Sequence, residues 1–184
     1  MTNRQQARSD AKLASQSHVR VAVWCAYASG VVSIFGIAFL VAFFTTFIGP
    51  LGTLNDAAVV IQYVLMVPMA VALHQILHRF GITASPVVLL LGILGMLAVI
   101  ALQLLFMAGV LQYAQYIVPV SAGFLVVLGW FLMVRRLGYP TGAIPASLTL
   151  NILAGLYVGY PVWAFSLGRR LREAGTEGVG RGAV

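Results

Sequence analysis

Long runs without a charged side chain dominate this sequence and limit what it can fold into. Between residues 21 and 168 the only charged residues are Asp56, Arg79, Arg135 and Arg136, and the stretches between them exceed 20 residues. A charge at the centre of a spanning helix costs roughly 2.5–3.5 kcal/mol during bilayer insertion. Charge-free stretches of about 20 residues therefore predict helices that cross a membrane.

The overall composition excludes a water-soluble domain. Hydrophobic residues make up 61% of the chain and charged residues only 8%, whereas soluble domains carry about 25% charged residues. The net charge of +7 is typical of some nucleic-acid-binding proteins. Here the basic residues flank apolar runs, where anionic lipid headgroups are nearer partners. We therefore expect a lipid bilayer as partner and no nucleic acid.

The apolar segments predict an all-α integral membrane protein, a bundle of five transmembrane helices. Residues 1–20 form a basic cytoplasmic tail in this interpretation, and residues 169–184 form a flexible tail rich in Gly and Arg. Gly49 and Pro50 indicate a turn before the second helix, which Asn55 or Asp56 can cap. The five helices are expected at about 21–47, 56–78, 86–109, 114–134 and 144–168.

Basic residues at the segment ends predict the orientation, because cytoplasmic flanks carry an excess of Lys and Arg. The N-terminal tail and the second and fourth loops carry seven basic residues, and the first and third loops carry none. This alternation indicates a cytoplasmic N-terminus. With five spans the C-terminal tail lies outside, although it carries the other four basic residues.

Two histidines four residues apart, His74 and His78, share one helical face. They are structural or interfacial, or His74 handles a proton or ligand, or the pair binds a metal or haem. Two ligands rarely complete a metal site, and a bis-histidine haem needs axial ligands from opposite sides of the ring. We expect no metal, and the pair is the candidate haem-binding site.

Other polar residues at membrane depth form two layers. At about 1.5 Å per residue, His74 and Asn151 lie at similar depths on the cytoplasmic side. An outer layer consists of Asp56, Gln62, Tyr63 and Gln103. Intramembrane polar groups face the bundle interior and seek partners there. These residues therefore line a polar pathway or form an interhelical hydrogen-bond network.

Small residues indicate where helices approach closely. Gly155 and Gly159 form a Gly-xxx-Gly pair in the fifth predicted helix, and such pairs let two helix backbones meet. The contact is within the chain or between copies in a homo-oligomer.

Recognisable catalytic patterns are absent from the sequence. It has no Gly-x-Ser-x-Gly elbow, no phosphate-binding glycine loop and no zinc-ligand spacing. No carboxylate or lysine lies deep in a span, whereas proton-coupled transporters usually depend on such groups. The sequence therefore assigns no catalytic residue and favours a protein that is not an enzyme.

One run, LGWFLMVRRLGYPTGAIPASLTLNILAGLYV, resembles a segment of small bacterial multi-pass membrane proteins of unknown function. Gly129, Arg136, Gly138 and Pro140 fill the pattern of a helix that ends in arginine, a Gly–Pro break and a new helix. LNDAAVVIQYVLMVPMAVALHQIL is similar to another of their helices. The resemblance covers about half of the chain and implies no activity.

Three functions are therefore expected of a bacterial cytoplasmic membrane protein of this kind. The first is a non-catalytic accessory or oligomeric component, with a homo-oligomer or a membrane complex as partner. The second is a permease or channel for a small solute. The third is a redox subunit that binds haem or interacts with quinone. Arginine outnumbers lysine ten to one, which indicates a GC-rich bacterial genome.

Overall fold

A computed structural model of the chain describes residues 3–79, 81–83, 85–138 and 159–180. Over these ranges the chain forms five helices and no strand, so the predicted all-α class is confirmed. The helices are α1 (Asn3–Thr46), α2 (Gly49–Arg79), α3 (Ser85–Met107), α4 (Tyr113–Gly138) and α6 (Gly159–Gly180).

Four helical segments are long and apolar enough to cross a membrane, and they mark the chain as a membrane protein. A rise of about 1.5 Å per residue lets each one cover the roughly 30 Å of a hydrocarbon core. A fifth span is not confirmed: residues 144–158 of the predicted helix 144–168 lie outside the described residues, and α6 is not among the four. The four segments are Arg20–Thr46, Gly49–His78, Pro86–Met107 and Tyr113–Leu137.

Helix α2 begins earlier than predicted. Only Phe47 and Ile48 separate it from α1, and Phe47 has a φ of 55°, in the left-handed region. The predicted breakers Gly49 and Pro50 start α2. Proline suits the first turn of a helix, where its fixed φ is helical and its missing N–H would have no partner. Asn55 therefore lies inside α2, and the predicted cap before residue 56 is wrong.

Helical structure also extends beyond the apolar segments at both ends of the chain. Helix α1 begins at Asn3, and α6 continues to Gly180 instead of ending at residue 168. The first extension contains several Ala, Gln and Arg residues and the second begins with RRLREA, and these residue types favour helix. In α6 the Arg169 Nε donates a hydrogen bond of 3.0 Å to Glu173 Oε1, one turn later. Residues 169–180 are therefore helical where a flexible tail was predicted.

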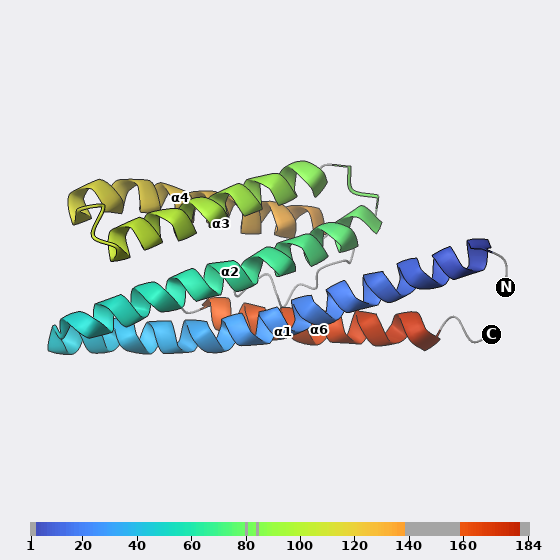
Figure 1. Cartoon of the computed structure of the whole chain (residues 1–184), viewed down its shortest axis with the longest axis horizontal. Coiled ribbons are helices and arrows are strands. Elements are labelled where there is room, and N and C mark those ends of the chain that lie inside the picture. Colours follow the sequence, from blue (N-terminus) through green and yellow to red (C-terminus); the bar gives the residue numbers. More distant parts are fainter. Residues whose placement is uncertain (1–2, 80, 84, 139–158, 181–184) are drawn as a thin grey trace.

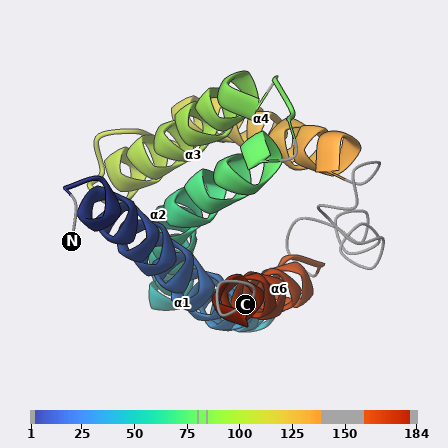
Figure 2. The ribbon, with the colours of Figure 1, turned by 90° about the vertical axis from the view of Figure 1, so that its right-hand side faces the viewer.

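The helices form two layers that share α2 (Figure 1). Helix α1 packs against α2 and α6, and α3 packs against α2 and α4. Figure 2 shows α6 beside α1, at the side of the bundle away from α3. The first four helices run alternately up and down, so α2 and α4 end where the N-terminus lies (Figure 1).

Helix α6 begins inside the bundle, not at its surface. Tyr160, its second residue, donates a hydrogen bond of 2.9 Å from its hydroxyl to Ser29 Oγ on α1. Ser29 lies about 14 Å along α1 from Arg20, where the spanning segment of α1 begins. From this depth α6 runs antiparallel to α1, toward the end of the bundle where the N-terminus lies (Figure 1). Arg169 and Arg172 therefore lie toward that end and not at the opposite end, where five spans would place them.

Basic residues consequently gather at one end of the bundle, which we call the basic end. There the spanning segment of α1 begins and those of α2 and α4 end, and α6 runs past the same end (Figure 1). Asp56 instead lies near the start of α2, toward the opposite end. The basic end is defined by Arg20, Arg79, Arg135, Arg136, Arg169 and Arg172.

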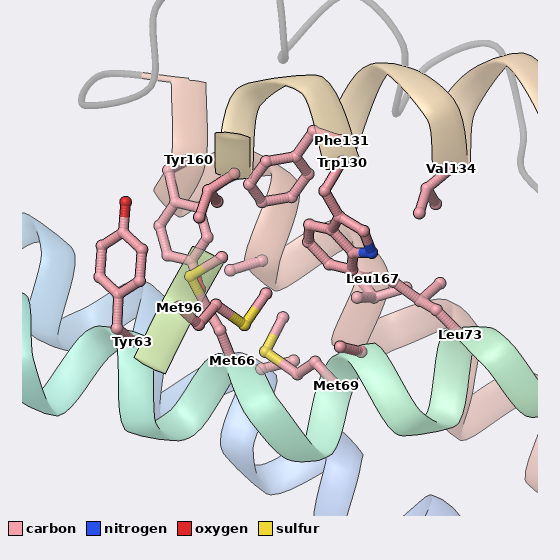
Figure 3. Packing of buried hydrophobic residues seen from close by; sticks show 14 of the residues in the cluster. Tyr63, Met66, Met69, Leu73, Met96, Trp130, Phe131, Val134, Tyr160 and Leu167 are labelled. Carbon is pink, nitrogen blue, oxygen red and sulfur yellow. The ribbon is translucent and has the colours of Figure 1, made fainter. Parts of the chain in front are cut away.

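The buried core lies between the two layers and is rich in methionine and aromatic rings (Figure 3). Trp130 is 1% exposed and lies against the backbone of α3. A Cβ added at Gly92 would lie 2.6 Å from Trp130 Cδ1, so only glycine leaves room for the indole. A Cβ at Gly95 or Gly123 would likewise lie within 3 Å of a valine on the facing helix. These three glycines set the close approach of α3 and α4.

Candidate functional site

Two of the predicted outer polar residues, Asp56 and Gln103, meet where α2, α3 and α4 come together. Gln103 is 1% exposed, and its side-chain oxygen accepts a hydrogen bond from the Tyr116 hydroxyl. The side chains of Gln103 and Asn55 lie within hydrogen-bonding range of the Asp56 carboxylate. The Tyr116 ring stacks on Phe106, with centroids 4.3 Å apart. We call Asn55, Asp56, Gln103 and Tyr116 the outer polar cluster.

Asp56 and Gln103, which the sequence placed in one layer, are brought together in this cluster. Sequence reasoning missed two of its members. Tyr116 lies close to the start of a segment, where it resembles an interfacial anchor, and Asn55 had been read as a helix cap. The Asn55 Oδ1 atom is buried and accepts no hydrogen bond within the described part of the chain.

Ser29 and Tyr160 form a second polar contact, between α1 and α6. The Ser29 hydroxyl is fully buried and donates 3.0 Å to the Ala26 carbonyl of its own helix, while it accepts from Tyr160. It also lies 3.6 Å from the Met69 sulfur on α2. The contact therefore joins three helices with hydrogen-bonding groups that lipid cannot satisfy.

His74 and His78 occupy the last two turns of α2, near the basic end. Their ring centroids are 5.9 Å apart and the ring planes make an angle of 59°. His74 is half-buried and His78 is exposed. Two imidazoles on one face of one helix do not supply opposite axial ligands to a haem. Across the described residues, no three His, Cys, Asp or Glu side chains group as a metal site.

Two of the predicted positions fall outside the described residues. They are Asn151, predicted at the depth of His74, and Gly155 of the Gly-xxx-Gly pair. Gly159 is the first residue of α6. At the α1–α6 contact a different glycine is close to its neighbour: a Cβ at Gly30 would lie 3.4 Å from the Ala164 Cβ.

Gln62 and Tyr63 line a cavity of about 160 Å³ between α2, α4 and α6. The Tyr63 and Phe124 ring centroids are 5.9 Å apart, and those of Phe131 and Tyr160 are 6.3 Å apart. Figure 3 shows Tyr63, Phe131 and Tyr160 around one part of the core. We call this space the aromatic cavity; its lining residues are Val59, Gln62, Tyr63, Met66, Phe124, Phe131 and Tyr160.

The cavity offers an incoming molecule mostly rings and aliphatic carbon. Tyr160 is fixed from behind by its bond to Ser29. Within the described part of the chain no hydrogen bond engages the Gln62 amide. The site can therefore stack a ring and form a hydrogen bond, and none of its described lining residues carries a charge.

No protein-family model matches the chain, and no curated protein or solved structure is significantly similar to it. The helices define a membrane protein, and the arrangement of its side chains must carry any more specific conclusion.

Proposed function

We propose that the chain is a non-catalytic component of a bacterial cytoplasmic membrane, acting as an accessory subunit of a membrane complex or as a homo-oligomer. One observation carries this proposal. In the described part of the chain, buried polar groups of the spanning helices bond to one another at helix contacts, as in Ser29 with Tyr160 and Gln103 with Tyr116. Such bonds hold helices together and leave few groups for chemistry.

Two further points support a bacterial membrane and a cytoplasmic N-terminus. The chain resembles small bacterial multi-pass proteins, and its basic residues gather at the end where the N-terminus lies (Figure 1). An excess of Lys and Arg favours the cytoplasmic side. The permease alternative has less support, because the residues predicted to line its polar pathway are divided between two sites. Asp56 and Gln103 lie in the outer polar cluster, whereas Gln62 lines the aromatic cavity.

Cross-linking in intact membranes, followed by purification in mild detergent, tests the proposal. We expect the tagged chain in a species of fixed mass that contains a partner chain or further copies. The variant His74→Ala should give the same species, since His74 takes part in neither buried polar contact. A chain that stays monomeric before and after cross-linking would contradict the proposal, and a Soret band in the purified sample would favour the haem alternative.

A further inference from the structure

The aromatic cavity lies at the middle depth of the membrane-spanning bundle. Its α2 residues fall at the centre of the span Gly49–His78, and Phe124 falls at the centre of the span Tyr113–Leu137. A molecule that reaches this depth from the bilayer has lost its hydration shell. A net charge is costly there, so the cavity suits a neutral molecule.

The volume and the walls restrict the occupant further. A dry apolar cavity of roughly 150 Å³ holds a molecule of benzene size, and the aromatic cavity has about 160 Å³. Aromatic side chains favour a further ring, at centroid distances of about 4.5–7 Å in stacked or edge-to-face geometry. Tyr63 with Phe124, and Phe131 with Tyr160, already pack ring against ring in this range, and all four line the cavity.

The Gln62 side chain distinguishes the cavity from a packing defect. The Gln62 amide carries two N–H donors and a carbonyl acceptor, and it is half-buried in the lining. An unpaired amide in apolar surroundings is unfavourable, and a ligand oxygen removes this cost. A saturated acyl chain offers no such oxygen.

We propose that the aromatic cavity is a binding site for a neutral single-ring molecule with oxygen on the ring, such as a phenol or a quinone head group, and that one ring oxygen bonds to Gln62. The ring lies between Tyr63 and Phe124 on one side and Phe131 and Tyr160 on the other. The site binds and performs no reaction in this proposal. It is independent of the accessory role proposed above, which requires only contacts between chains.

Ligand-observed ¹⁹F NMR on the full chain in nanodiscs tests this inference with two probes, 4-fluorophenol and fluorobenzene. We expect both to bind saturably, with 4-fluorophenol the tighter. Gln62→Leu should weaken 4-fluorophenol about threefold to tenfold, the equivalent of one net hydrogen bond, and leave fluorobenzene unchanged. Empty nanodiscs measure partition into lipid.

A volume change gives a second, separate test. Val59 is buried and lines the cavity, so Val59→Phe should fill it and abolish saturable binding of both probes. Val64→Phe is the matched control, because Val64 lies on the same helix and is exposed on the outside of the bundle. Should Val59→Phe fail to fold, the Gln62→Leu comparison decides alone. Equal binding of 4-fluorophenol to wild type and Gln62→Leu, or binding no greater than in empty nanodiscs, would overturn the proposal.

Discussion

Trp130 fits into the core only because residue 92 has no side chain. A methyl group at Gly92 would fall 2.6 Å from the indole, and this ring is too large and too buried to move aside cheaply. Forcing extra carbon into a packed core typically costs about 1–3 kcal/mol. We therefore expect Gly92→Ala to lower the free energy of unfolding by about this amount, measured by reversible unfolding in mixed micelles.

Gly129→Ala on α4 is the control for this substitution, since nothing described lies within 4 Å of its added Cβ. Alanine is the better helix former by up to about 1 kcal/mol, so this variant should be neutral or more stable. An equal change in stability in both variants would contradict a clash with the indole as the reason for the glycine at position 92.

The hydroxyl of Tyr160 is the polar part of the contact between α6 and α1. Tyr160→Phe keeps the ring in the cavity wall and removes the hydrogen bond to Ser29. A single hydrogen bond within a membrane bundle contributes about 0.6 kcal/mol on average and up to about 1.7. We expect a loss in this range, and almost none for Tyr113→Phe, whose side chain is exposed. Thermal denaturation in detergent, followed by circular dichroism, measures both.

Depth along a helix can be predicted from sequence, but the direction in which a side chain points is harder. Asp56 and Gln103 were grouped correctly because hydropathy gives depth. Tyr116 and the aromatic cavity were missed because they depend on how α4 and α6 are rotated about their axes. Apolar residues surround the spanning helices on all sides, so no polar face in the sequence indicates that rotation.

Helix ends show the same limit at the scale of the element. Gly49 and Pro50 indicate a break between helices, and the break is present. It is only two residues long, because proline also starts helices and these two residues belong to the first turn of α2. Residues 169–180 resemble a tail by their charge and glycine content, yet α6 continues through them to Gly180. Hydropathy marks where lipid ends and not where a helix ends.

The pairing of α6 with α1 can be tested by a disulfide. The Cβ atoms at positions 30 and 164 would lie 3.4 Å apart, close to the 3.5–4.5 Å of disulfides. In a Cys25→Ser background, Gly30→Cys with Ala164→Cys should cross-link under mild oxidation, detected as a loss of free thiols. Gly30→Cys with Val162→Cys should not, because Val162 is exposed on another face of α6. Cross-linking of the second pair but not the first would contradict the described packing.

For the molecule as a whole, the basic end resolves a conflict in the sequence. Five spans would place four of the eleven basic residues on the outer side. Because α6 begins inside the bundle and ends beside the N-terminal part of α1, Arg169 and Arg172 join the other basic residues at one end (Figure 1). A count of apolar segments could not predict this, since α6 is only partly apolar.

Labelling of single cysteines tests this topology. In a Cys25→Ser background, we expect Gln112→Cys, in the link between α3 and α4, to react with a membrane-impermeant maleimide in intact cells. Thr83→Cys and Arg172→Cys should react only after the cells are permeabilised, because the proposed orientation puts the basic end in the cytoplasm. Labelling of Arg172→Cys together with Gln112→Cys would show that α6 ends on the outer side. If all three variants showed the opposite labelling, only the proposed orientation in the membrane would be contradicted, and the arrangement of the helices would stand.

The links at the end of the bundle opposite the basic end indicate how such a chain inserts into its membrane. Only two links of the described helices reach that end, Phe47–Ile48 and residues 108–112, and neither contains a charged residue. If the basic end stays in the cytoplasm, as the proposed orientation requires, α1 with α2, and then α3 with α4, can partition into lipid as helical hairpins. In the spanning segments of these four helices, Asp56 is the only charged residue that lies toward the end opposite the basic end. Insertion of these four helices therefore requires no hydrophilic domain to cross the membrane.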